Sequence, residues 1–160
     1  MRGAVAAALT ALALAPAGAA AEPPPGQPDL WATVNVCDTP KRPDTIGIRA
    51  SMPGIPRGTR MAMRFRVQYR TRDGWVDVAD ADSGWRRLGA AGGNAVQSGW
   101  SFTFARPATG TVLLRGVAWM RWRRGGHTVR RAEVPTSAGH RSSAGADPPG
   151  YSAATCALGS

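Results

Sequence analysis

The chain has 160 residues, of which 20 are Lys or Arg, 10 are Asp or Glu, and 43% are hydrophobic. A chain of this length fits one domain and excludes a protein with two large catalytic lobes. The hydrophobic fraction excludes a wholly disordered chain. Beyond roughly the first twenty residues the sequence has no apolar run of about eighteen residues, so we expect no membrane-spanning helix there.

The N-terminal segment has the composition of a secretory signal peptide. Arg2 gives it a positive start, an apolar run rich in Ala and Leu follows, and small residues lead to an expected cleavage site after Ala21. The sequence therefore predicts a signal peptide over residues 1–21 and a secreted, extracellular protein. We expect residues 22–29 to form a Pro-rich leader and residues 30–160 to form the folded domain.

The chain has two cysteines, Cys37 and Cys156, near the two ends of the expected domain. In an oxidising exterior these cysteines have only each other as partners, so the sequence predicts a Cys37–Cys156 disulfide. The alternative is a catalytic thiol, which would need a nearby base and a reason to stay reduced.

Alternation of apolar and polar residues predicts a series of β-strands. The pattern is clearest from Met61 to Arg70, where odd positions hold Met, Phe, Val and Tyr and even positions hold Ala, Arg and Gln. Shorter runs of this kind occupy residues 31–37, 45–52, 75–78, 100–104, 111–123 and 127–134. Gly125-Gly126, between the last two runs, predicts a two-residue hairpin turn.

About seven short strands, separated by Gly and Pro turns and without a credible helix, indicate an all-β fold. We expect an immunoglobulin-like antiparallel β-sandwich. Residues 137–149 are polar and small and are expected to form a loop. Residues 151–156 are then expected to return as a last strand or edge segment.

Residues 65–70 (FRVQYR), followed by Gly74 and Trp75, resemble the third-strand region of fibronectin type III and related immunoglobulin-like domains. Residues 102–118 are similar to the passage of that family from its E strand to its F strand. Two features depart from the family: Val112 stands near the place of the corner tyrosine, and a disulfide between the ends is atypical. The resemblance implies a scaffold or binding role without specifying a partner.

Arginines gather on the polar faces of the two longest predicted strands. If these strands pair, as in immunoglobulin-like domains, their outer faces merge into one basic surface on which guanidinium groups stack on indole rings. Such a surface suits an anionic partner, whether an acidic cell-wall polymer, a nucleic acid or an acidic protein. The candidate anion- or partner-binding residues are Arg64, Arg66, Arg70, Arg115, Trp119 and Arg121.

The arginines also have a structural interpretation. The chain holds nineteen Arg and one Lys, an excess that a GC-rich genome encodes wherever any cation serves. Arginine alternating with tryptophan can form a ladder that shields a sheet and keeps the protein soluble without binding any ligand.

Candidate catalytic residues are few. The histidines, His127 and His140, are both expected to be exposed to solvent, and the sequence contains no G-x-S-x-G motif. Two histidines and a paired set of cysteines leave too few ligands for a zinc site. The sequence therefore predicts no catalytic residue, no metal and no cofactor.

One acidic cluster interrupts the basic sequence. It could hold Ca²⁺, or supply two carboxylates about 5–10 Å apart for sugar hydrolysis, although it lacks the distal Glu of a calcium loop. The simpler interpretation is a solvated turn whose carboxylates pair with Arg86 and Arg87. The cluster consists of Asp73, Asp77, Asp80 and Asp82.

The tryptophans divide into two expected groups. Trp31 and Trp100 lie in apolar runs and are expected in the core. Trp75 and Trp85 each follow a glycine beside the acidic cluster, where they either pack or offer an exposed surface to a sugar ring.

These patterns favour a secreted or cell-surface β-sandwich module with a non-catalytic binding or structural role. Its expected partner is a cell-envelope polymer or another exported protein. One alternative is a polyanion-binding domain that uses the Arg/Trp face, and another is a small secreted hydrolase that uses the Asp73–Asp82 cluster.

Overall fold

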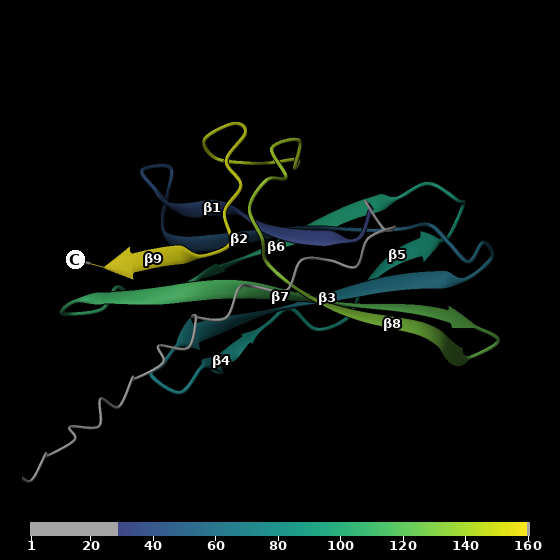
Figure 1. Cartoon of the computed structure of the whole chain (residues 1–160), viewed down its shortest axis with the longest axis horizontal. Helices are drawn as coiled ribbons and strands as arrows, with labels where there is room; N and C mark the ends of the chain where they lie inside the picture. The colour runs from purple at the N-terminus through teal and green to yellow at the C-terminus, as the bar shows by residue number, and fades with distance from the viewer. Residues whose placement is uncertain (1–28, 160) are drawn as a thin grey trace, which may run out of the picture.

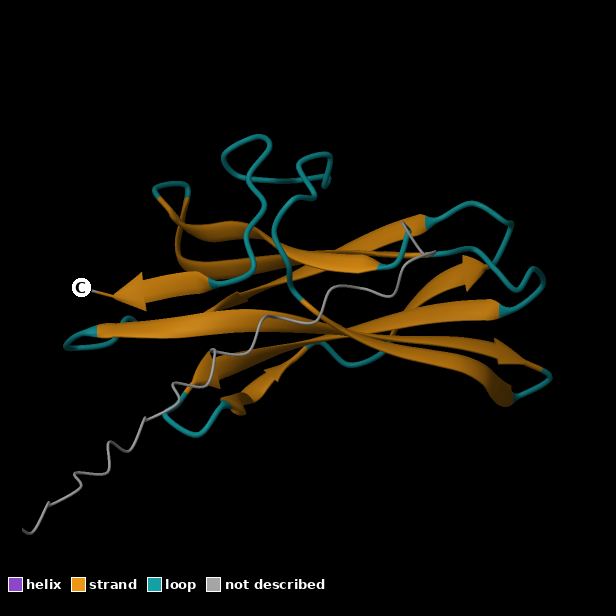
Figure 2. Ribbon diagram, viewed as in Figure 1, coloured by secondary structure: helices purple, strands orange, loops and turns teal. Residues whose placement is uncertain are grey.

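The computed structural model describes residues 29–159. The expected signal peptide, and all of the expected Pro-rich leader except its last residue, lie outside the described residues. Within them the secondary structure consists of nine β-strands without a helix (Figures 1 and 2). Residues 29–159 thus contain no helix that is long and apolar enough to cross a membrane.

The strands form two antiparallel sheets stacked as a sandwich (Figure 2). They are β1 (Trp31–Thr39), β2 (Arg42–Met52), β3 (Arg60–Arg70), β4 (Trp75–Asp82), β5 (Arg86–Ala90), β6 (Val96–Thr103), β7 (Thr111–Arg124), β8 (His127–Pro135) and β9 (Cys156–Gly159). The smaller sheet has the order β1-β2-β6. The larger sheet has the order β4-β3-β7-β8, with β5 also beside β3 and β9 also beside β7. The predicted all-β sandwich is confirmed.

Two short strands account for the difference from the seven or so predicted. The β5 strand pairs with the first half of β3, on the edge where β4 pairs with the second half. The β9 strand shares one edge of β7 with β8 in the same way. Strands of five and four residues are too short to show a clear alternation in the sequence. Of the predicted return over 151–156, only Cys156 belongs to a strand, whereas Ala153 exchanges two backbone hydrogen bonds with Val34.

The core lies between the two sheets, and the alternation in the sequence determines which side chains fill it. Met63 and Phe65 of β3 belong to the same buried cluster as Ile46 and Ile48 of β2, and none of the four is more than 1% exposed. The sheets approach closely at Gly116, where a Cβ atom would lie 2.6 Å from the Ile48 side chain. Glycine is therefore the residue that fits at this position of β7.

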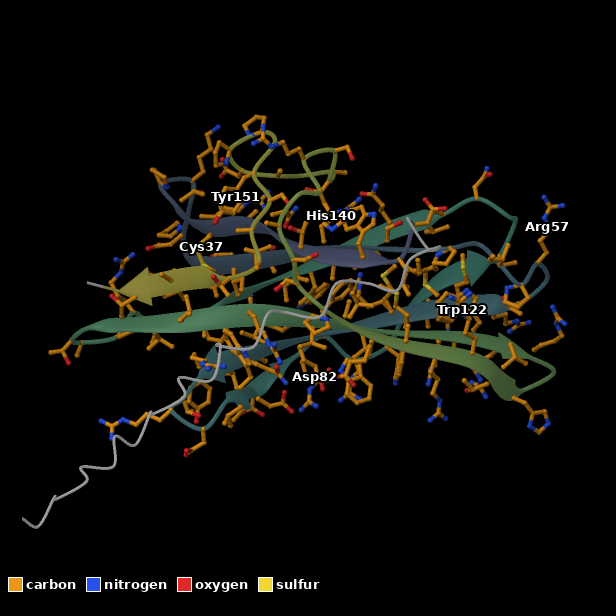
Figure 3. The ribbon with its side chains drawn as sticks, in the orientation of Figure 1. Cys37, Arg57, Asp82, Trp122, His140 and Tyr151 are labelled. Carbon is orange, nitrogen blue, oxygen red and sulfur yellow. A yellow bond between two sulfur atoms is a disulfide. The ribbon has the colours of Figure 1, made fainter. Side chains whose placement is uncertain are left out.

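Two links join the sheets toward opposite ends of the sandwich (Figure 3). The predicted disulfide between Cys37 of β1 and Cys156 of β9 is confirmed, with the two Cα atoms 5.4 Å apart. Toward the other end, the fully buried Trp122 of β7 donates a hydrogen bond from Nε1 to the Pro53 carbonyl, 2.9 Å away, directly after β2. The Arg130 guanidinium lies over the same indole ring, 4.6 Å from its centroid.

Two sequence predictions about aromatic residues need correction. Trp31 is buried as expected, but Trp100 is 39% exposed, because β6 is the edge strand of the smaller sheet. The Arg86 guanidinium covers the Trp100 ring at 4.2 Å. His140, predicted to be exposed, is half-buried and stacks on Trp31 with 4.5 Å between ring centroids.

Candidate functional site

The outer face of the larger sheet carries the arginines that the sequence singled out. The β3 and β7 strands are neighbours, so the predicted pairing that merges their outer faces is confirmed. In this register Arg64 stands opposite Trp119, and Arg121 stands opposite Ala62. The face divides into two regions with different electrostatics.

In the first region, arginines are neutralised by aspartates. The Arg64 guanidinium forms a two-pronged contact with Asp82, whose Oδ1 lies 2.7 Å from Arg64 Nε. Arg66 pairs with Asp77 at 2.9 Å and with Asp82 at 3.6 Å. The hydrogen bond from Arg64, followed by one from the Gly84 amide, holds the pKa of the Asp82 carboxyl below its ordinary value.

The predicted pairing of the acidic cluster with Arg86 and Arg87 is wrong. Because β4 lies beside β3, Asp82 stands opposite Arg66, and Asp77 stands close to the same arginine. Both carboxylates are therefore held in ion pairs along the sheet. Within residues 29–159, no three side chains of His, Cys, Asp or Glu gather closely enough to hold a metal ion.

We expect Asp82→Asn to lower the stability of the fold by about 1 kcal/mol at pH 7, since the contact is partly exposed to solvent. The pKa of Asp82 is lower in the folded state than in the unfolded state. The ionised carboxylate therefore contributes its full stabilisation above the unfolded-state pKa, which is near 4, and this stabilisation is lost as pH falls through the folded-state pKa. The difference in stability between wild type and variant should therefore shrink as pH falls below about 4. Thermal unfolding midpoints across this pH range measure the effect.

The control is Asp80→Asn, which changes a carboxylate that is exposed and forms no ion pair within the described chain. Asp80 has a φ of 61°, a conformation that asparagine also adopts readily. This variant should follow the wild-type acid profile. A constant difference between wild type and the Asp82 variant from pH 7 to 2 would contradict the assigned role of the carboxylate.

Further along the same region, two guanidinium groups lie over the Trp75 ring. Arg115 lies 4.5 Å and Arg70 lies 5.5 Å from the ring centroid. Arg115 also donates a hydrogen bond of 2.8 Å from Nε to the side-chain carbonyl of Gln68. Four of the arginines predicted to bind a ligand are thus engaged within the protein, as the ladder interpretation expects. We call this region the arginine ladder.

The second region is an arginine cluster without a neutralising carboxylate. Arg60 of β3 stands directly opposite Arg123 of β7, and Arg121 of β7 stands directly opposite Arg131 of β8. Arg87 of β5 stands opposite Ala62 of β3, beside this group. Within residues 29–159, none of these five arginines forms an ion pair. Like charges placed directly across a strand pair repel each other.

Arg121 lies at the centre of the cluster. Its guanidinium stacks on the Trp85 ring, 3.8 Å from the centroid. Burial first, and then the charges of Arg123, Arg131 and Arg87, lower the pKa of this guanidinium. Its Nε atom is buried and has no hydrogen-bond partner within the described chain. An anion bound here would offset charge that the protein leaves uncompensated.

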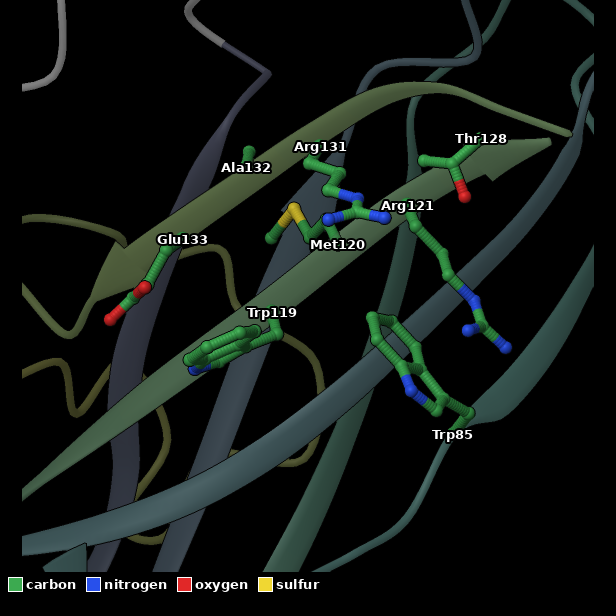
Figure 4. A pocket seen from close by; sticks show the side chains of 8 residues that line it. All are labelled: Trp85, Trp119, Met120, Arg121, Thr128, Arg131, Ala132 and Glu133. Carbon is green, nitrogen blue, oxygen red and sulfur yellow. The ribbon is translucent and has the colours of Figure 1, made fainter.

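A hollow of about 410 Å³ opens beside Arg121, and we call it the tryptophan hollow. Figure 4 shows Trp119 and Trp85 on its two sides, with Arg131 and Glu133 of β8 along its rim. A second hollow, of about 320 Å³, shares Arg121. Its other arginines are Arg60, Arg87 and Arg123.

The structure brings together only some of the candidates from the sequence. Arg121 and Trp119 lie at the tryptophan hollow, whereas the other four arginines form the ladder. Sequence reasoning missed Arg60, Arg87, Arg123 and Arg131 as part of a site. Arg60 and Arg123 continue the alternation of their strands, so the sequence pattern could have identified them. Arg87 and Arg131 depend on which strands pair with β3 and β7, which a single sequence does not reveal.

The chain was also compared with known proteins. It matches no protein-family model, no curated protein and no solved structure.

Proposed function

We propose that this protein is a secreted, non-catalytic binding module that holds acidic polymers against the outer face of its larger sheet. The arginine cluster is the observation that carries the proposal, because none of its five guanidinium groups forms an ion pair within residues 29–159 and four of them line one hollow. An acidic polymer of the cell envelope fits such a face, since many weak contacts along a repeating anion add to a stable complex.

We further assign the sandwich to the immunoglobulin-like class. Strand order supports the assignment: β1, β2 and β6 take the places of strands A, B and E in one sheet. The β4, β3, β7 and β8 strands take the places of C′, C, F and G in the other. Domains of this class commonly serve as binding modules, which agrees with the proposed role.

The energetics of the cluster favour a binding role over a purely structural one. Two like-charge pairs, Arg60 with Arg123 and Arg121 with Arg131, lower the stability of the sheet. A ladder whose purpose is to protect the sheet would place carboxylates among its arginines, as the neighbouring region does with Asp77 and Asp82. The arginines of the cluster form no such ion pairs within residues 29–159.

The test measures binding of poly-L-glutamate, an anion without a sugar, to the secreted chain at several salt concentrations. The triple variant Arg87→Ser, Arg123→Ser and Arg131→Ser should bind at least about tenfold more weakly at low salt. The slope of log affinity against log salt should become shallower by about 3, roughly one for each lost contact. Both like-charge pairs lose one member in this variant. Its free energy of unfolding should therefore be about 0.5 kcal/mol higher than that of the wild type.

A matched control removes the same charge elsewhere. Arg42, Arg72 and Arg141 are exposed and lie outside both hollows that contain Arg121. Changing these three to Ser should leave affinity within about twofold of wild type. Equal losses in the two triple variants would show that net charge, rather than the cluster, attracts the polymer, and the proposal would then be wrong.

A further inference from the structure

We infer that the tryptophan hollow is a saccharide subsite, which takes one carboxylate-bearing sugar unit of an acidic polysaccharide. The inference rests on the proposed function and narrows its ligand from acidic polymers in general to polymers of acidic sugars. Three features of the hollow support it: an accessible indole, a preorganised guanidinium, and a carboxylate that would repel a ligand made only of anionic groups.

The indole of Trp119 gives the hollow an apolar platform. The side chain is 36% exposed although it lies in the middle of the sheet face, between β3 and β8. Its strand neighbours across the sheet, Arg64 and Glu133, are both polar. A flat aromatic surface bordered by polar groups suits a sugar ring, which presents an apolar C–H face together with hydroxyl groups at its edge.

The guanidinium groups supply the anion contact. Arg121 is fixed by stacking on Trp85, so little side-chain freedom remains to be lost when an anion binds. Arg131 stands directly opposite Arg121 and lines the same hollow. A carboxylate on the sugar ring would meet both positive charges while the ring lies toward Trp119.

Glu133 discriminates between classes of ligand. Its carboxylate lines the hollow and forms no ion pair within residues 29–159, and an ionised carboxylate only accepts hydrogen bonds. A chain of phosphates or carboxylates alone has no donor for it and would be repelled. Sugar hydroxyls donate hydrogen bonds, and Thr128 lines the hollow as a further hydroxyl group. The donor and acceptor set of the hollow therefore matches a sugar that also carries a negative charge.

The experiment compares two probes that share a carboxylate but differ in the sugar. Oligogalacturonide and poly-L-glutamate are titrated separately into the secreted chain and its variants, and affinity is measured calorimetrically. Trp119→Ala should weaken oligogalacturonide binding at least about tenfold and change poly-L-glutamate binding less than about twofold. An unchanged far-UV circular dichroism spectrum shows that the variant is folded. Trp100→Ala is the matched control, because Trp100 is 39% exposed but lies on the edge strand of the other sheet.

Glu133→Ala gives the sharper result, because the two probes should respond with opposite signs. Loss of a negative charge should strengthen poly-L-glutamate binding, whereas loss of the hydroxyl acceptor should weaken oligogalacturonide binding. Strengthening of both, or an equal effect of Trp119→Ala on both, would overturn the saccharide assignment while leaving the anion-binding proposal intact. Tighter binding of oligothymidylate than of oligogalacturonide, with the same dependence on Trp119, would overturn it in favour of a stacked nucleic-acid base.

Discussion

Replacing both cysteines, by Cys37→Ala and Cys156→Ala, is expected to lower the free energy of unfolding by about 4–5 kcal/mol. The bond closes a loop with a sequence separation of 119 residues, so its absence greatly enlarges the conformational freedom of the unfolded chain. It also joins β1 of one sheet to β9 of the other. Urea unfolding of the oxidised wild type and of the double variant measures the difference.

The single variants provide the control for this prediction. Each of them removes the bond, so each should lose about as much stability as the double variant, and the losses should not add. Hydrogen exchange should accelerate first in β9, whose four residues, within residues 29–159, form a strand pair only with the start of β7. A double variant within about 1 kcal/mol of the oxidised wild type would contradict the entropic account.

Trp122→Ala is expected to cost about 3–5 kcal/mol, which is typical when a large buried aromatic side chain is deleted. The indole is fully buried between the sheets, and its removal would also leave the Pro53 carbonyl without its donor. The Arg130 guanidinium would lose the ring on which it lies. Denaturant unfolding, with the slope compared between proteins to confirm a common two-state transition, measures the loss.

Trp122→Phe separates packing from hydrogen bonding. Phenylalanine retains much of the apolar volume but has no donor for Pro53, so we expect a loss of about 1–3 kcal/mol. If Phe proves as damaging as Ala, the hydrogen bond rather than the packing dominates at this position. If Ala costs less than about 1 kcal/mol, this end of the sandwich is not held by Trp122.

The sequence correctly predicted the features that depend on local alternation of apolar and polar residues, namely which face of a strand each side chain occupies. Period-two patterning over Met61–Arg70 correctly separated the core-facing Phe65 from the outward Arg64, because each strand residue alternates between the two faces of a sheet. The hairpin at Gly125-Gly126 followed from the need for positive φ at both positions, which are 55° and 85°. The disulfide followed from the number of cysteines and the expected oxidising compartment.

Features that depend on strand pairing could not be predicted. The partner of Asp82 is set by the register of β4 on β3, so the expected pairing with Arg86 and Arg87 had no local basis. The opposition of Arg121 and Arg131 likewise appears only once β7 and β8 are aligned across the hairpin and its bulge. Trp100 is exposed because β6 lies at the edge of its sheet. The residues of β6 do not by themselves indicate whether that strand is central or at an edge.

The disulfide also determines how the domain would respond to mechanical force. A pull applied through the segments before Cys37 and after Cys156 passes from one sulfur to the other, because the bond bypasses the chain between them. Most of the strands, including β3, β7 and β8 with the arginine cluster, lie inside that bypassed segment, so their covalent backbone would not carry the load. If this face holds a polymer as proposed, the chain between the cysteines would keep its extended length while the protein is stretched between two attachments.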